Sequence, residues 1–104
     1  MMIRTSERRA TIRMAASYVA TLRTRHRIIA RGKTANISEG GVLVIVHRNP
    51  RLPSDGQELL VDLIIPADPA AGTKREVTYL CRVTRHEELA HLMAIGLAFI
   101  RKIA

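Results

Sequence analysis

Apolar and polar residues alternate along the second half of the chain with the period of two that is typical of half-buried β-strands. The stretches "QELLVDLIIP", "EVTYLCRVTR" and "HLMAIGLAFI" show this pattern most clearly. Their predicted inward positions are Leu59, Val61, Leu63, Ile65, Val77, Tyr79, Cys81, Val83, Met93, Ile95, Leu97 and Phe99. We therefore expect three strands in this half, each with one face in a hydrophobic core.

Three further strands are predicted in the first half, over residues 14–22, 27–37 and 41–46, with Gly32 marking a β-bulge. Turn formers separate the strands, in "HRNPRLPSDG" and in the loop "ADPAAGTK", and "EELAH" could form a single helical turn. Six strands joined by turns in so short a chain favour an antiparallel barrel or sandwich. Because a closed barrel leaves no strand edge unpaired, we predict an all-β fold, a six-stranded antiparallel β-barrel.

The N-terminal segment differs from the rest of the chain. The stretch "RTSERRATIR" holds four arginines and few residues that a core could bury. We therefore predict two parts, a flexible basic N-terminal arm over residues 1–13 and a barrel domain over residues 14–104.

Composition narrows the class of protein. The 104 residues suit one domain, and 47% of them are hydrophobic, with only three aromatic residues, so the core must be aliphatic. A single cysteine excludes an intramolecular disulfide, and neither a signal peptide nor an apolar run of membrane-spanning length is present. These features predict a cytoplasmic protein without a membrane span. The net charge of +8 favours an anionic partner, such as a nucleic acid, a nucleotide or an anionic membrane surface.

Candidate catalytic groups are sparse. The four histidines lie on different segments without metal-ligand spacing, and His86 and His91 are expected to be solvated beside a turn. Cys81 falls on the apolar face of a strand, where a small buried hydrophobe is expected rather than a nucleophile. The few carboxylates form no evident acid–base pair. We therefore predict neither an enzyme nor a metal site.

Two short stretches can bind an anion. Arg9 and Arg13 are four residues apart, Arg8 adjoins Arg9, and a guanidinium can bind a phosphate or the O6 and N7 edge of guanine through paired hydrogen bonds. In "NISEGG", Asn36 and Ser38 are two residues apart and so point to the same side of an extended strand end. The two glycines that follow allow backbone angles that other residues resist and let the backbone approach a ligand.

Together these stretches resemble the PilZ domain, a bacterial receptor family for the second messenger cyclic di-GMP. Arg9 and Arg13 match the RxxxR motif of the family, and Asn36, Ser38 and Gly41 match its (D/N)xSxxG motif. The segments "GQELLVDLIIP", "CRVTR" and "IGLAF" resemble its later strands, although Arg85 stands where many relatives have Trp. The resemblance implies that cyclic di-GMP binds to Arg8, Arg9, Arg13, Asn36, Ser38, Gly40, Gly41 and Arg85.

The resemblance also implies a mechanism and a stoichiometry. Ligand phosphates would relieve the repulsion between the arginines and order the N-terminal arm, and a downstream partner protein would read the new surface. In the family, an Arg directly before RxxxR accompanies a stacked ligand dimer, so Arg8 implies two cyclic di-GMP molecules per chain. Two alternatives stay open: a basic barrel that binds single-stranded nucleic acid, which the scarcity of stacking aromatics disfavours, and a PilZ-like interaction domain without ligand binding.

Overall fold

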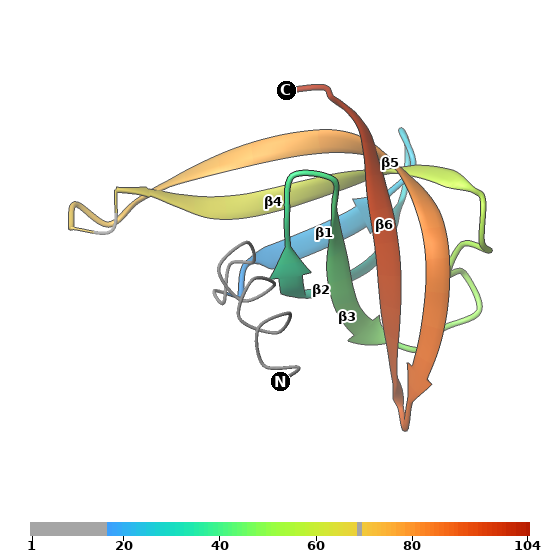
Figure 1. The fold of residues 1–104 in the computed structure, drawn as a ribbon. Helices are drawn as coiled ribbons and strands as arrows, with labels where there is room; N and C mark the ends of the chain where they lie inside the picture. Colours follow the sequence, from blue (N-terminus) through green and yellow to red (C-terminus); the bar gives the residue numbers. More distant parts are fainter. Residues whose placement is uncertain (1–16, 69) are drawn as a thin grey trace, which may run out of the picture.

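The computed structural model describes residues 17–68 and 70–104, and this part of the chain consists of six strands joined by turns and loops. The strands are β1 (Val19–Arg23), β2 (Ile28–Ile37), β3 (Gly41–His47), β4 (Glu58–Asp68), β5 (Thr73–Leu89) and β6 (Leu92–Lys102). All neighbouring strands pair antiparallel and close a barrel in the order β1-β2-β3-β6-β5-β4 (Figure 1). The predicted six-stranded antiparallel barrel is confirmed. The described residues include no helix that is long and apolar enough to span a membrane.

The barrel interior is aliphatic, as the composition predicted. Its fully or nearly fully buried side chains are Ala20, Leu22, Val42, Val44, Val46, Leu59, Val61, Leu63, Val77, Cys81, Val83, Ile95 and Leu97. Ile65, Tyr79, Met93 and Phe99 pack against this core as partly buried residues. All twelve positions that the alternation predicted to face inward therefore do so, because the period of two matches the pleat of the strands.

The largest differences between the predicted and the observed strand limits occur at three places. β1 begins at Val19, after residues 17 and 18, and residues 14–16 lie outside the described part of the chain. β4 and β5 continue into the predicted loop "ADPAAGTK", and their long hairpin reaches beyond the barrel (Figure 1). β5 also continues to Leu89, so "EELAH" forms no helical turn; a tight turn with Ala90 at φ 57° follows instead.

Gly32 is not a bulge. It pairs in register with Ala20 of β1 and Val46 of β3, and a Cβ atom at this position would clash with the carbonyl oxygen of Ile45. Glycine at this position therefore allows the backbones of β2 and β3 to pack closely, and it does not mark a bulge.

Cys81 is completely buried in the core, and this burial raises the pKa of its thiol to about 12. The thiol consequently remains protonated near neutral pH, and a buried, neutral thiol is a poor nucleophile. The predicted role of Cys81 as a small buried hydrophobe is confirmed.

Asp62 connects three strands where β1 and β4 close the barrel. Arg23 donates to its carboxylate from Nε at 2.5 Å and from Nη2 at 3.1 Å, and Thr78 Oγ1 donates at 2.6 Å. Burial acts to raise the pKa of the Asp62 carboxyl, but the hydrogen bonds from Arg23 and Thr78 outweigh it, and the pKa lies below its ordinary value. The ionised carboxylate thus stabilises the closed barrel.

We expect Asp62→Asn to lower stability at neutral pH by about 1.5–3 kcal/mol, because hydrogen bonds to a charged group are lost. A carboxyl with a lowered pKa contributes stability above its unfolded-state pKa of about 3.9, and this contribution disappears as the pH falls through the folded-state value. Thermal unfolding of wild type and variant, measured from neutral to strongly acidic pH, should therefore converge in acid. Glu39→Gln, an exposed carboxylate in a turn, is the control. A difference that stays constant with pH would contradict this role of Asp62.

Candidate functional site

The "NISEGG" segment forms the turn between β2 and β3, and backbone hydrogen bonds and core packing fix it to the barrel. Within the turn, the backbone N–H of Ser38 donates to the carbonyl of Gly41 at 2.9 Å. The carbonyl of Gly40 accepts from the N–H of Phe99 on β6, also at 2.9 Å. Ile37 packs against the core, whereas Glu39 is exposed. The turn is therefore a fixed part of the barrel surface.

A shallow pocket of about 180 Å³ lies beside this turn on the outer face of the barrel. It is lined by Asn36, Ile37, Ser38, Gly41, Val42, Leu43, Thr84, Arg85, Gly96 and Leu97. Four of the predicted ligand-binding residues, Asn36, Ser38, Gly41 and Arg85, are thus brought together from two distant parts of the sequence. Gly40 is in the turn but does not line the pocket. Arg8, Arg9 and Arg13 lie outside the described residues.

The pocket follows one row of directly paired residues across four strands. Asn36 of β2 is opposite Leu43 of β3, Leu43 is opposite Gly96 of β6, and Gly96 is opposite Arg85 of β5. Since neighbouring strands are about 4.8 Å apart, the two polar ends of the row are separated by roughly 14 Å. Between them lie the side chain of Leu43 and the backbone of Gly96, over which the side chain of Arg85 extends. The pocket therefore joins polar groups from two distant segments across a mainly apolar surface.

Two β-bulges turn the ends of this row outward. In β2, the register shifts between Thr34 and Asn36, so Thr34 is buried in the barrel while Asn36 lies on the outer face. In β5, it shifts between Val83 and Arg85, so Val83 remains in the core while Arg85 is exposed. An extra residue in one strand reverses the alternation of side chains beyond it. The bulges therefore set the composition of the pocket.

The polar groups of the pocket are available to a ligand. Within the described part of the chain, the side chains of Asn36, Ser38 and Arg85 have neither hydrogen bonds nor ion pairs. An amide and a hydroxyl can donate to and accept from the edge of a base, and a guanidinium can stack on a ring or bind an anion. The arrangement therefore suits a planar, anionic ligand.

The two glycines of the turn differ from each other, and the expected special backbone angles occur at neither. The described glycines with positive φ are Gly56 and Gly72. A Cβ atom at Gly41 would clash with the carbonyl oxygen of Leu97, whereas a Cβ atom at Gly40 would have no neighbour within 4 Å. Close approach between β3 and β6 therefore requires glycine at position 41.

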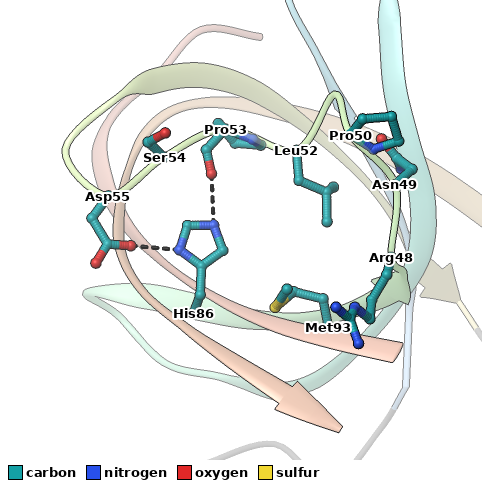
Figure 2. A pocket seen from close by; sticks show the side chains of 9 residues that line it. All are labelled: Arg48, Asn49, Pro50, Leu52, Pro53, Ser54, Asp55, His86 and Met93. Carbon is teal, nitrogen blue, oxygen red and sulfur yellow. Dashed lines mark hydrogen bonds and ion pairs between the residues drawn. The ribbon is translucent and has the colours of Figure 1, made fainter. Parts of the chain in front are cut away.

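A larger, open hollow of about 800 Å³ lies between the loop after β3 and the β5–β6 hairpin. Figure 2 shows His86 pointing toward this loop, with Nδ1 2.5 Å from Asp55 Oδ1 and Nε2 2.6 Å from the carbonyl of Pro53. His86 is therefore a structural link rather than the solvated side chain we expected. His91 stacks on His47 with ring centroids 5.6 Å apart. No group of three or more metal-ligating side chains occurs among residues 17–68 and 70–104.

Sequence reasoning did not identify Leu43, Thr84 and Gly96 as pocket residues. Gly96 offered a signal, because a glycine inside a strand often marks close approach of a ligand or another chain segment. Leu43 and Thr84 gave none, since an outward-facing leucine and threonine are ordinary on a sheet. Their role depends on cross-strand register, which the alternation of residues does not specify.

Comparisons with known proteins agree with this geometry. The family model described as the PilZ domain matches residues 7–104. The solved structure of the Bacillus subtilis inhibitor of motility (MotI/DgrA) has a similar fold, with a TM-score of 0.74 and 19% sequence identity. The aligned region covers 89% of this chain but 43% of that one, so the chain spans less than half of the length of that protein. No curated protein matches the chain.

Proposed function

This chain belongs to the PilZ domain family, and we propose that it binds cyclic di-GMP on the outer face of its barrel and passes the signal to a partner protein. PilZ domains are ligand-binding and regulatory modules rather than catalysts. The observation that carries the proposal is the pocket itself, which the three motif residues Asn36, Ser38 and Gly41 line together with the guanidinium of Arg85. We further propose that the protein acts in the cytoplasm and is not an enzyme.

Each side of the pocket has a distinct part in this proposal. Asn36 and Ser38 bind the polar edge of one guanine, whose ring lies over Leu43 and reaches toward the Arg85 guanidinium. Arg85 closes the far end of the row and stacks on the base, in place of the aromatic residue that many relatives have there. Arg9 and Arg13 bind the phosphates from the N-terminal side.

The signal, in this proposal, is an ordering of the N-terminal arm. Arginines close together repel one another, and the ligand phosphates remove that repulsion when they bind. The arm is then held against the barrel beside the "NISEGG" turn, and the combined surface is recognised by a downstream partner. A partner-binding function without the ligand remains the competing hypothesis for a domain of this family.

Isothermal titration with cyclic di-GMP tests the proposal directly. Saturable binding that is abolished in the paired variant Asn36→Ala/Ser38→Ala would support it, with Asn49→Ala as a control in a distant loop. Binding to single-stranded oligonucleotides alone would favour the nucleic-acid alternative. Absence of both, with an intact thermal transition, would indicate an interaction domain without a nucleotide ligand.

We also propose that two cyclic di-GMP molecules bind per chain as a stacked pair. Such a pair brings four phosphates into a small volume, where Arg8 adds a third guanidinium beside Arg9 and Arg13. Arg8→Leu is expected to lower the molar ratio from two to one while binding persists, and higher salt should weaken wild type more than the variant. Titration well above the dissociation constant measures the ratio. Saturation of the wild type at one ligand would overturn this assignment of Arg8.

A further inference from the structure

The residues before and after Arg85, Thr84 and His86, each contact another segment of the chain through their side chains. We propose that Thr84 is a positioning residue for Arg85. In this role, Thr84 holds the bulge that places the guanidinium across Gly96 at the end of the pocket. The proposal rests on the proposed function, because it assigns a specific task to Arg85 in ligand binding. It adds a residue outside the motifs that identified the site.

The bulge at Thr84 determines where Arg85 points. Val83 is paired with Leu97 and Arg85 with Gly96, so Thr84 is the extra residue of β5. Without it, the alternation that buries Cys81 and Val83 would turn Arg85 toward the barrel interior. A buried arginine without a partner is strongly unfavourable, so the outward position of Arg85 depends on this single extra residue.

Thr84 is itself fixed by β6. Its hydroxyl donates to the carbonyl oxygen of Gly96 at 3.0 Å, which ties the bulge to the residue that faces Arg85 across the strands. A bulge lacks regular ladder hydrogen bonds at its extra residue, so a side-chain bond of this kind restricts its movement.

The absence of a side chain at Gly96 allows the Arg85 side chain to pack against the backbone of β6. A Cβ atom at position 96 would be 3.0 Å from Cγ of Arg85 and 3.2 Å from its Nε, and 3.0 Å from the hydroxyl oxygen of Thr84. The arginine side chain therefore runs directly over the glycine backbone, and Gly96 is buried beneath it. This packing defines the path of a side chain that has no hydrogen-bonding partner within the described residues.

His86 anchors the other side of Arg85. Beyond the bulge the alternation is reversed, so His86 points toward the loop, where its ring nitrogens contact Asp55 and the carbonyl of Pro53 (Figure 2). The backbone on both sides of Arg85 is thus held by side-chain contacts. A side chain held in its bound orientation loses less freedom when a ligand binds, and affinity increases accordingly.

A double-mutant cycle in cyclic di-GMP affinity tests the proposal. Thr84→Val removes the hydroxyl at nearly constant volume and should weaken binding about three- to tenfold, the range expected for one neutral hydrogen bond. Thr84→Ser should restore affinity to within about twofold of wild type. In an Arg85→Ala background, Thr84→Val should have little further effect, because the residue that it positions is gone. An equal loss of affinity in both backgrounds would overturn the proposal.

A second measurement keeps the test independent of ligand binding. In the ligand-free protein, the ¹⁵N relaxation of the Arg85 Nε–H group should show restricted motion, compared with the exposed Arg31 on β2. Thr84→Val and His86→Ala should increase the motion of Arg85, whereas His91→Ala, in the adjacent turn, should not. If wild type fails to bind cyclic di-GMP but Arg85 is restricted as described, the proposed function fails and the positioning role stands. If Arg85 is as mobile as Arg31 in wild type, the positioning role itself is wrong.

Discussion

Replacing Arg9 or Arg13 by alanine is expected to remove most of the affinity for cyclic di-GMP and to leave the barrel intact. In the proposed complex, each substitution removes charge-assisted hydrogen bonds to a phosphate, which are worth about 1.5–3 kcal/mol, or roughly a 10- to 150-fold loss of affinity. Among the described residues, the buried side chains of the core lie between Ala20 and Leu97, so we expect the thermal transition not to move. Isothermal titration and thermal unfolding of the same samples measure both quantities.

Arg31→Ala is the matched control for these variants. Arg31 is an exposed arginine on β2, paired with Thr21 of β1 and outside the pocket, so its removal lowers the net charge equally. A similar loss of affinity in all three variants would mean that general charge, rather than the RxxxR motif, attracts the ligand. Unchanged affinity in Arg9→Ala and Arg13→Ala would remove the arm from the site.

Alanine at position 41 is expected to be strongly destabilising, whereas alanine at position 40 is not. The added Cβ at Gly41 clashes with the Leu97 carbonyl, and a backbone atom can move away only if β3 and β6 separate. Overpacking of this kind costs about 1–3 kcal/mol, and 1 kcal/mol lowers the melting temperature of a domain this size by roughly 4–8 °C. Gly41→Ala should also weaken ligand binding, because the Gly41 carbonyl holds the N–H of Ser38.

Gly40→Ala is the control within the same turn. Nothing lies within 4 Å of its added Cβ, and φ is not positive at this residue, so stability should change by less than about 0.5 kcal/mol. Thermal unfolding monitored by circular dichroism distinguishes the two variants. Equal melting temperatures of the two variants would show that the packing of β3 against β6 does not require glycine at position 41.

The alternation of residues was sufficient to predict the later strands of the barrel and their inward faces. In β4, Leu59, Val61 and Leu63 are separated by residues on the outer face, and the same period identified β5 and β6. Glycines and prolines indicated the turns after β2, β3 and β4, whereas the turns after β1 and β5 contain neither residue type. The alternation does not specify the register between strands. The length of a hairpin such as β4–β5 depends on this register more than on local strand propensity.

Three residues of the candidate site form a short motif, whereas Arg85 was expected there only through the family resemblance. Asn36, Ser38 and Gly41 are close in sequence and could be found together, whereas Arg85 joins them through the β3–β6 and β5–β6 pairings. The bulges on β2 and β5 were not predicted, because each consists of an ordinary residue in an otherwise regular strand. Gly32, which was expected to form a bulge, lies in regular register instead.

The pairing of β3 with β6 also has a consequence for synthesis of the protein. β3 contains the apolar run "VLVIV" and pairs with β2 on one edge and with β6 on the other, and β6 is synthesised after the other five strands of the barrel. Until then, one edge of β3 has no partner, and an exposed apolar strand edge promotes aggregation. Barrel closure must therefore follow translation of β6, and contacts so distant in sequence form slowly. Lower growth temperature during expression should consequently raise the soluble yield of this domain.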